Sequence, residues 1–361
     1  MSGPSPICFG LVGTGWRAEF YARVARACPE RFRIAGVTGR TPERVEAFAR
    51  KFGVSIYDSI DDLVARGRPL FVVTSVPWDV NPEVVTTLAE LGMPVLSETP
   101  PARTVEEMSA LCEVVRDRGV TVQVAEQYFL QPHHAARLAV AHAGRLGRVT
   151  QAQVSAAHGY HGISLIRKYL GIGYENVCMR ARQFESPVLT PPHRGEPTER
   201  EELTTSRQTL AWFDFGDRLG VFDFANEQYF SPIRNPRILV RGERGEILGD
   251  RVHYVKTHPR AVSLECVRHE AGQHGNLEGQ YLKGIQLGED WVYENPVAPA
   301  RLADDEIAIA DCLLRMASHV RGGPMFYPLA EACQDRYLDI LLGQAVETGE
   351  TIKSETQPWV D

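Results

Sequence analysis

Two histidines and a tyrosine lie within four consecutive residues, at His158, Tyr160 and His161. A histidine titrates near neutral pH and can act as the general base that removes a proton from an alcohol. A tyrosine or a carboxylate can assist such a base by hydrogen bonding. Glu126 and Tyr128, at the end of a predicted strand earlier in the chain, supply further groups of these kinds. These residues are our candidates for acid–base chemistry on a hydroxyl group.

Other interpretations of the same residues stay open. In a regular strand His158 and Tyr160 would share one face and His161 would point to the other, so one of them would be structural. His158 and His161 with Glu126 resemble an N,N,O zinc ligand set, but no defined motif supports a metal, and we predict none. The pair His133–His134 is interpreted as the entry to a helix.

A glycine-rich segment follows the first apolar run. Residues 10–18 read G-L-V-G-T-G-W-R-A, in which Gly13, Gly15 and Ala18 match G-x-G-x-x-G/A. Such glycines permit a tight turn and let the backbone approach a pyrophosphate at the start of a helix. Because the match lies between a predicted strand and a predicted helix, it indicates dinucleotide binding.

The end of the second predicted strand bears on which dinucleotide binds. An acidic residue there would bond the ribose 2′-hydroxyl of NAD, whereas a nearby arginine suits the 2′-phosphate of NADP. The chain has Thr38, Arg40 and Thr41 at this place and no acid. This pattern favours NADP, with NAD as the alternative.

The elements that must position these groups alternate between strand and helix in the first third of the chain. Such alternation predicts a parallel sheet with helical crossovers, and we assign residues 1–128 to a Rossmann NAD(P)-binding domain. The strands are predicted at 6–12, 31–40, 70–76, 93–98 and 120–127, with a short strand and helix in 55–67. The helices are predicted at 17–28, 42–53, 82–92 and 104–119.

The rhythm changes after residue 128. Residues 129–361 are predicted to form an α+β substrate-binding and oligomerisation domain with a mostly antiparallel open sheet, whose final helix could pack back on the first domain. Hairpins are predicted in 207–230 and 236–255, helices at 133–144, 304–320 and 328–349, and an exposed excursion at 186–202. The aromatic side chains of 213–230 are assigned to the sheet core or to an interface.

Length and composition limit the classes of function. With 361 residues the chain should hold two domains, and its net charge of −7 argues against a general nucleic-acid binder. No apolar run approaches the roughly 18 residues that span a membrane, and the first ten residues do not resemble a secretion signal. Seven dispersed cysteines are typical of reduced core thiols in a cytoplasmic protein.

The chain resembles the glucose–fructose oxidoreductase / inositol dehydrogenase (Gfo/Idh/MocA) family in three features. These are the glycine loop, the Ser97-Glu98-Thr99-Pro100 segment after the predicted fifth strand, and the two-domain layout. Residues 141–149, 161–171 and 345–349 extend the resemblance over nearly the whole chain. The family usually carries E-K-P after that strand, where the lysine helps to move the proton. It also carries D-x-G-x-H at the start of a helix, with both ionisable groups facing the substrate.

This chain departs from both motifs. Thr99 replaces the lysine, and in the stretch 157–161 Ala157 replaces the aspartate while His161 keeps the histidine position. The resemblance therefore implies that cofactor positioning is retained. Since threonine cannot do the lysine's chemistry, either His161 and its neighbours handle the proton or the protein does something other than simple alcohol oxidation.

The expected site residues fall into three groups. Catalytic groups are His161, Tyr160 and Glu126, and substrate contacts are Thr99, Tyr128, His158 and His161, with Arg182, Arg194, Trp212 and Lys283 as further residues that could reach a substrate. Cofactor contacts are expected from Gly10, Gly13, Thr14, Gly15, Trp16, Arg17, Thr38, Arg40, Ser75, Pro77, Asn81, Glu98, Thr99 and Gln127.

We expect an NAD(P)-dependent oxidoreductase acting on a hydroxyl or keto group of a sugar, glycoside or cyclitol. One alternative is a lyase or glycosidase that uses an internal redox cycle of tightly bound NAD(P). Another is a catalytically inactive binding or regulatory homologue. We further expect a cytoplasmic homodimer or homotetramer that binds a small carbohydrate-like molecule and neither nucleic acid nor membrane.

Overall fold

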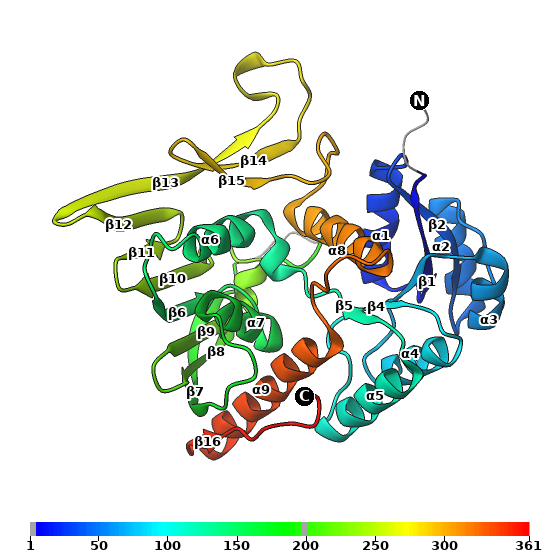
Figure 1. Cartoon of the computed structure of the whole chain (residues 1–361), viewed down its shortest axis with the longest axis horizontal. Coiled ribbons are helices and arrows are strands. Elements are labelled where there is room, and N and C mark those ends of the chain that lie inside the picture. Colours follow the sequence, from blue (N-terminus) through cyan, green and yellow to red (C-terminus); the bar gives the residue numbers. More distant parts are fainter. Residues whose placement is uncertain (1–4, 196–200, 361) are drawn as a thin grey trace.

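The computed structural model describes residues 5–195 and 201–360 and contains two sheets (Figure 1). The smaller sheet has five parallel strands in the order β2-β1-β3-β4-β5. Its strands are β1 (Ile7–Val12), β2 (Phe32–Thr38), β3 (Phe71–Thr74), β4 (Val95–Ser97) and β5 (Val122–Val124). This arrangement confirms the predicted Rossmann-like sheet, and its parallel strands direct their carboxyl ends to one edge, where ligands bind in such folds.

Helices cover both faces of this sheet. They are α1 (Trp16–Ala27), α2 (Pro42–Phe52), α3 (Ile60–Asp62), α4 (Asn81–Glu90) and α5 (Val105–Arg118). Local chemistry fixes several boundaries: α2 starts at a proline and ends before left-handed Gly53, and α5 starts with a Thr104–Glu107 capping box. One face of the sheet shares a hydrophobic core with α1, α2 and α8 (Asp304–Val320), although α8 comes late in the sequence.

The larger sheet has eleven strands and is mostly antiparallel, as expected, with β6 and β9 as the parallel neighbours. Its order is β15-β14-β13-β12-β11-β10-β6-β9-β8-β7-β16. The strands are β6 (Val149–Ser155), β7 (Cys178–Leu189), β8 (Leu203–Asp214), β9 (Leu219–Ala225), β10 (Arg237–Gly242), β11 (Gly245–Leu248), β12 (Arg251–Thr257), β13 (Arg260–Glu270), β14 (Leu282–Leu287), β15 (Asp290–Glu294) and β16 (Ile352–Lys353).

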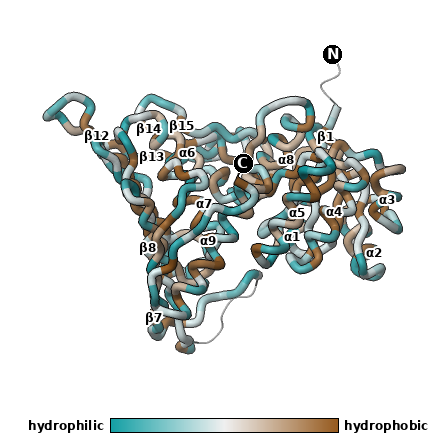
Figure 2. Tube along the Cα trace, turned by 60° about the horizontal axis from the view of Figure 1, so that its bottom comes forward, coloured by the Kyte–Doolittle hydropathy of each residue, from teal (hydrophilic) through white to brown (hydrophobic). Residues whose placement is uncertain are grey.

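Three helices form a layer on one face of the larger sheet: α6 (Pro132–His142), α7 (Gly159–Leu170) and α9 (Leu329–Thr348). Figure 2 shows this layer between the sheet and the first domain. The helix α9 also contacts α5 and β5, while α8 packs on α1. Two C-terminal helices therefore hold the first domain against the second, and the strand ends of the small sheet face the start of α7.

The structure corrects several expectations about elements. The segment 55–67 forms only a bridge at Ile56, a short helical turn and a π-helical turn, so Ser97-Glu98-Thr99 follows the fourth strand and not the fifth. The strand β6 ends at Ser155, so residues 158–161 start a helix and the alternating-face interpretation is wrong. Residues 196–200 of the predicted excursion lie outside the described residues.

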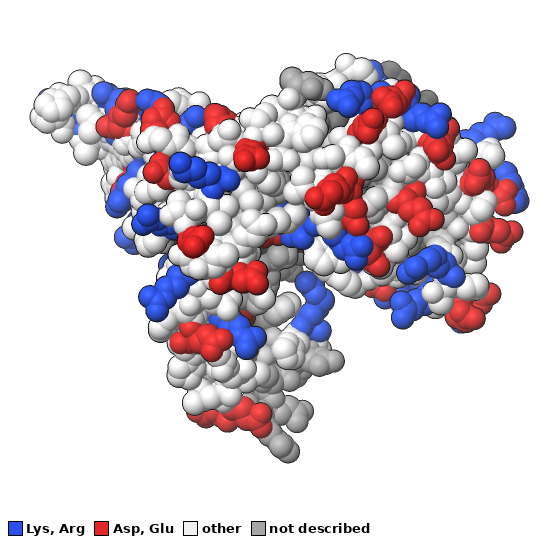
Figure 3. Space-filling view, turned by 90° about the horizontal axis from the view of Figure 1, so that it is seen from below, with Lys and Arg blue, Asp and Glu red and all other residues white. Residues whose placement is uncertain are grey.

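Two surface properties bear on the expected partners. Among the described residues, no helix has both the length and the apolar character needed to cross a membrane. Basic and acidic side chains are interspersed on the face shown in Figure 3. All seven cysteines are free, and Cys178 lies exposed on β7, so assigning every thiol to the core is wrong.

Candidate active site

A cleft of about 1160 Å³ extends along the carboxyl edge of the small sheet and ends against the second domain. One side of the cleft is formed by the loop after β1, the segments after β2, β3 and β4, and the residues after β5. The start of α7, the N-terminus of α8 and Tyr229 with Phe230 form the other. The cleft thus joins the glycine loop to the histidine cluster, which the sequence places about 150 residues apart.

The glycine loop has the backbone that its sequence predicts. Gly13 has φ +105°, and a Cβ atom there would lie 2.1 Å from the carbonyl oxygen of Ser75, so only glycine fits. Gly15 is the N-cap of α1, and a Cβ atom at Gly15 would meet nothing within 4 Å. The open space at the start of a twelve-residue helix is suited to a phosphate group.

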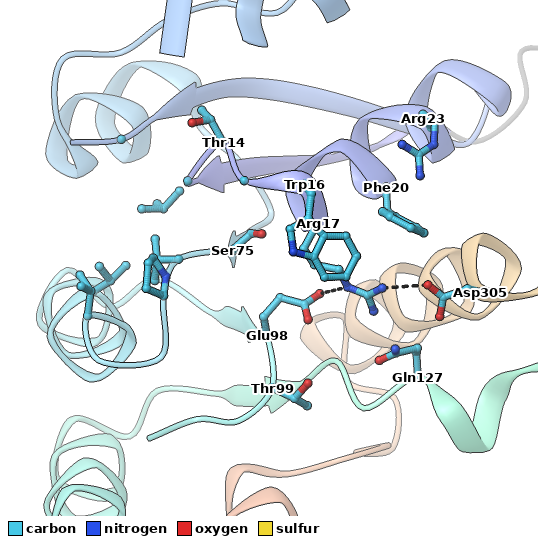
Figure 4. Close-up of a pocket in the computed structure, with 18 of the residues that line it drawn as sticks. Thr14, Trp16, Arg17, Phe20, Arg23, Ser75, Glu98, Thr99, Gln127 and Asp305 are labelled. Atoms are coloured by element: carbon cyan, nitrogen blue, oxygen red, sulfur yellow. Dashed lines mark hydrogen bonds and ion pairs between the residues drawn. The ribbon is translucent and has the colours of Figure 1, made fainter. Parts of the chain in front are cut away.

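Arg17 lies at the centre of a charge network beside this loop (Figure 4). Its Nε donates to Glu98 at 3.1 Å and its Nη1 donates to Asp305 of α8 at 2.9 Å. The Tyr21 hydroxyl donates to the same Glu98 carboxylate. These carboxylates raise the pKa of Arg17, so its guanidinium stays charged although it is almost fully buried.

Two buried polar atoms near this network have no hydrogen-bond partner among the described residues: Nη2 of Arg17 and Oε1 of Gln127. A buried donor or acceptor left without a partner costs about 1–3 kcal/mol, so such atoms are expected to meet a ligand or ordered water. Both residues line the cleft. They therefore offer one donor and one acceptor to a bound molecule.

The far end of the cleft has the residues expected to read a ribose. Thr38, Arg40 and Thr41 line this end, and Arg44 on the first turn of α2 joins them. Thr38 is buried at the end of β2, whereas both arginines are exposed. Sequence reasoning missed Arg44, which lies four residues after Arg40, on the first turn of α2.

At the other end, Glu126 and His161 form a buried pair. Nδ1 of His161 lies 2.5 Å from Oε2 of Glu126, and the side chains are 7% and 1% exposed. Burial raises the pKa of Glu126 to about 8, opposed by a hydrogen bond from the backbone N–H of Tyr128. Burial also lowers the pKa of His161 to about 3, and the nearby Arg17 cation contributes. The low-dielectric setting therefore favours a neutral imidazole whose Nε2 remains for the cleft.

Tyr160, Thr99 and His158 surround this pair. A hydrogen bond with the Thr99 side chain opposes the rise that burial causes in the pKa of Tyr160. The ring of His161 packs against Tyr160, His158 and Tyr128 at centroid distances of 4.4, 5.0 and 4.5 Å. Thr99 therefore lies beside a phenol and an imidazole, in the place where the resembling family has its lysine.

Most of the predicted site residues share this cleft. Thr99, Tyr128, His158, Tyr160 and His161 line its second-domain end, while Glu126 lies behind His161. The predicted cofactor residues that line the remainder are Gly13, Thr14, Gly15, Trp16, Arg17, Thr38, Arg40, Ser75, Pro77, Glu98, Thr99 and Gln127.

Other predicted residues lie elsewhere. Gly10 is buried within β1 against Leu63 and does not line the cleft. Asn81 is buried and bonds Thr74, Ser97 and the carbonyl of Pro101, so it connects the strand ends and does not line the cleft.

Of the four residues suggested to reach a substrate, only Arg194 lines the cleft, where it stacks on Trp16 at 4.6 Å. Trp212 lies on the exposed face of the large sheet and Lys283 pairs with Glu278. Arg182 lies beside Leu210 in the same sheet. Tyr229 and Phe230 were assigned to the sheet core or an interface, but they lie at the end of the short 3₁₀ helix that follows β9, and they line the cleft.

The residues present fit a dinucleotide. The glycine cradle at Gly13 and Gly15, the polar far end at Thr38 and the unpartnered atoms of Arg17 and Gln127 provide contacts along the cleft. For metals, no cluster of three or more His, Cys, Asp or Glu side chains able to hold an ion occurs in residues 5–195 and 201–360.

Comparison with known proteins agrees with this geometry. Residues 7–126 match the model of an oxidoreductase family with an NAD-binding Rossmann fold, GFO_IDH_MocA. A myo-inositol dehydrogenase, Hyg17 of Streptomyces leeuwenhoekii, is 36% identical over 109 residues, which are 30% of this chain and 33% of that protein. The alignments to the first curated relatives span only 33 to 41% of those relatives' lengths.

Solved structures extend the likeness in fold to nearly the whole chain. A levoglucosan dehydrogenase in complex with NADH and levoglucosan superposes with a TM-score of 0.69 at 16% identity, covering 96% of this chain and 99% of that one. An oxidoreductase from Agrobacterium radiobacter in complex with NAD+, L-tartaric acid and magnesium gives 0.68 at 16% identity, covering 96% and 98%.

Proposed function

We propose that this chain, whose residues 7–126 match the GFO_IDH_MocA family of oxidoreductases with an NAD-binding Rossmann fold, is a dehydrogenase or reductase that acts on a hydroxyl or keto group of a sugar, glycoside or cyclitol. The observation that carries the proposal is the buried Glu126–His161 pair at the end of the cleft, next to Thr99. Relatives named for myo-inositol and levoglucosan support the substrate class.

The chain's own residues account for binding of the cofactor. The loop Gly13–Arg17 would hold the pyrophosphate, and Thr38 with Arg40 would hold the adenosine ribose. Gln127 and Arg17 would take the nicotinamide end through their unpartnered atoms. When bound, NAD(P) supplies the acceptor or donor of a hydride.

Proton transfer falls to His161. Once Glu126 is ionised, above a pH of about 8, Nδ1–H of His161 donates to its carboxylate, so Nε2 has a lone pair and can accept the proton of a substrate hydroxyl. The carboxylate also stabilises the imidazolium that this transfer creates. Thr99 and Tyr160 cannot replace a lysine as a base, but their hydroxyls can orient the reacting oxygen.

The direct test is to incubate the purified protein with NADP, NAD and a panel of sugars, glycosides and cyclitols while following nicotinamide absorbance. Turnover of a polyol supports the proposal. If no compound of the panel changes the nicotinamide absorbance, although cofactor binding has been demonstrated separately, the proposal would be overturned. Cleavage of a glycosidic bond without net nicotinamide turnover would instead support the lyase or glycosidase hypothesis.

We also propose that NADP is preferred, because Arg40 and Arg44 flank Thr38 and the cleft has no acid there. Replacing Arg40 with alanine should weaken NADPH binding by about tenfold or more, because a charge-assisted bond to the 2′-phosphate is lost. NADH affinity should be unchanged. Dissociation constants from NAD(P)H fluorescence check this, with the exposed Arg50 on the same helix, changed to alanine, as the control. An equal loss for both cofactors would contradict the assignment.

A homodimer or homotetramer is proposed from the uncovered face of the large sheet. Phe184, Leu210 and Trp212 share that face and are 53, 38 and 56% exposed, while Phe213 on the opposite face is buried. Trp212→Glu should shift the molar mass measured by light scattering to a smaller species. Leu277→Glu, at an exposed loop position, should not. A monomeric wild-type protein would refute the proposal.

A further inference from the structure

The hydroxyl of Tyr229 has three hydrogen-bond partners, which together use its proton and both of its lone pairs. It accepts from the backbone N–H of His158 at 3.0 Å and from the hydroxyl of Tyr128 at 3.3 Å. A phenol oxygen offers one proton and two lone pairs, so both lone pairs are in use. With this assignment the remaining contact, 2.6 Å to Nδ1 of His158, uses the Tyr229 proton.

This assignment fixes the tautomer of His158. Because Nδ1 accepts the proton of Tyr229, a neutral imidazole at this position carries its own hydrogen on Nε2. The residue remains neutral at working pH, since burial lowers the pKa of His158 to about 3. His158 lines the cleft and is the N-cap residue of α7, whose backbone holds it in place.

The two cleft histidines consequently have opposite hydrogen-bonding characters. His161 has Nδ1 on a carboxylate and can present an accepting Nε2, whereas His158 has Nδ1 on a phenol and presents a donating Nε2–H. Their ring centroids are 5.0 Å apart. One substrate oxygen can therefore give its proton to His161 while a neighbouring oxygen of the same molecule accepts from His158.

We propose that His158 is a specificity-determining donor that recognises the oxygen adjacent to the reacting hydroxyl, and that Tyr229 is the positioning residue that fixes its tautomer. The inference rests on the proposed function and narrows its substrate class to polyols with two adjacent oxygens. A substrate without the second oxygen leaves the Nε2–H without a partner. The expected discrimination is about tenfold to a hundredfold in kcat/KM.

The tautomer can be measured without any substrate, by ¹⁵N–¹H correlation spectra of protein labelled at histidine. The signals of His158, identified by their loss in His158→Gln, should show the Nε2–H form near neutral pH. Tyr229→Phe should allow the Nδ1–H form, while Tyr254→Phe, which lies on β12 outside the cleft, should leave His158 unchanged. A protonated or Nδ1–H His158 in the wild-type protein would overturn the proposal even if the enzyme is active.

Kinetic measurements test, separately from the tautomer, whether His158 recognises the adjacent oxygen of the substrate. For a substrate found in the panel, removal of the adjacent hydroxyl should lower kcat/KM about tenfold to a hundredfold in the wild type and by much less in His158→Ala. His158→Gln, which keeps a donor, should restore part of the discrimination, and His253→Ala on β12 is the control. Equal discrimination in wild type and His158→Ala would refute the role in recognition. If no substrate turns over, the proposed function fails, whereas the spectra still decide the tautomer.

Discussion

Replacing His161 with glutamine is expected to lower turnover of the alcohol substrate by roughly 10²- to 10⁴-fold, the usual contribution of a general base. Glutamine can keep a hydrogen bond to the buried Glu126 carboxyl, so the fold should tolerate it better than alanine. It cannot take a proton from a hydroxyl group. The measurement is kcat and KM with a substrate from the panel, together with the dissociation constant of the cofactor.

The dissociation constant of the cofactor distinguishes a loss of catalysis from a loss of structure. We expect it to remain within about twofold of the wild-type value, since His161 lies on α7 and the glycine loop lies on the other domain. His133→Ala is the matched control: its ring also faces charged groups, Asp250 and Asp304, but lies outside the cleft. Unchanged turnover in His161→Gln would show that another group moves the proton. Absence of turnover in both the variant and the wild type would favour the inactive homologue.

Structural features that depend only on consecutive residues could be predicted from the sequence. The turn at Gly13 and the helix that begins at Trp16 were predictable because each has its own backbone signal, whereas the entry to α7 at Gly159 was indicated only by the family resemblance. The position of Thr99 at a strand end also followed from the pattern. The error in strand count arose at Ile56, which makes one bridge without extending it into a strand.

Contacts between distant segments could not be predicted in the same way. The bond between Glu126 and His161 depends on α7 packing against the turn that follows β5, and Arg17 meets Asp305 only because α8 returns to the first domain. Asn81 shows the converse problem. A polar residue after a strand suggests a ligand contact, yet tertiary packing buries it among Thr74 and Ser97.

Glu126→Gln is expected to remove both most of the activity and its pH dependence. Below a pH of about 8 the buried Glu126 is protonated and donates to Nδ1, so His161 has its hydrogen on Nε2 and cannot act as a base. Above that pH the carboxylate accepts from Nδ1–H and Nε2 becomes a base. Alcohol oxidation by the wild type should therefore rise as pH increases through about 8, and carbonyl reduction should fall.

The environment of Glu126 sets the pKa of its carboxyl group. Burial raises the pKa of Glu126, the N–H of Tyr128, the Arg17 cation and the Ser164 hydroxyl lower it, and Asp305 raises it. An amide at residue 126 does not titrate and cannot stabilise an imidazolium, so Glu126→Gln should lose roughly 10²-fold or more in kcat/KM and give a nearly flat profile.

Initial rates between about pH 6 and pH 10, in buffers of constant ionic strength, measure both effects. Glu98→Gln serves as a comparison, because it removes a different cleft carboxylate, one that bonds Arg17 and not His161. If the rise near pH 8 survives in Glu126→Gln, the titrating group lies elsewhere. If it disappears there and persists in Glu98→Gln, the Glu126–His161 pair is the proton-handling unit that replaces the lysine missing at Thr99.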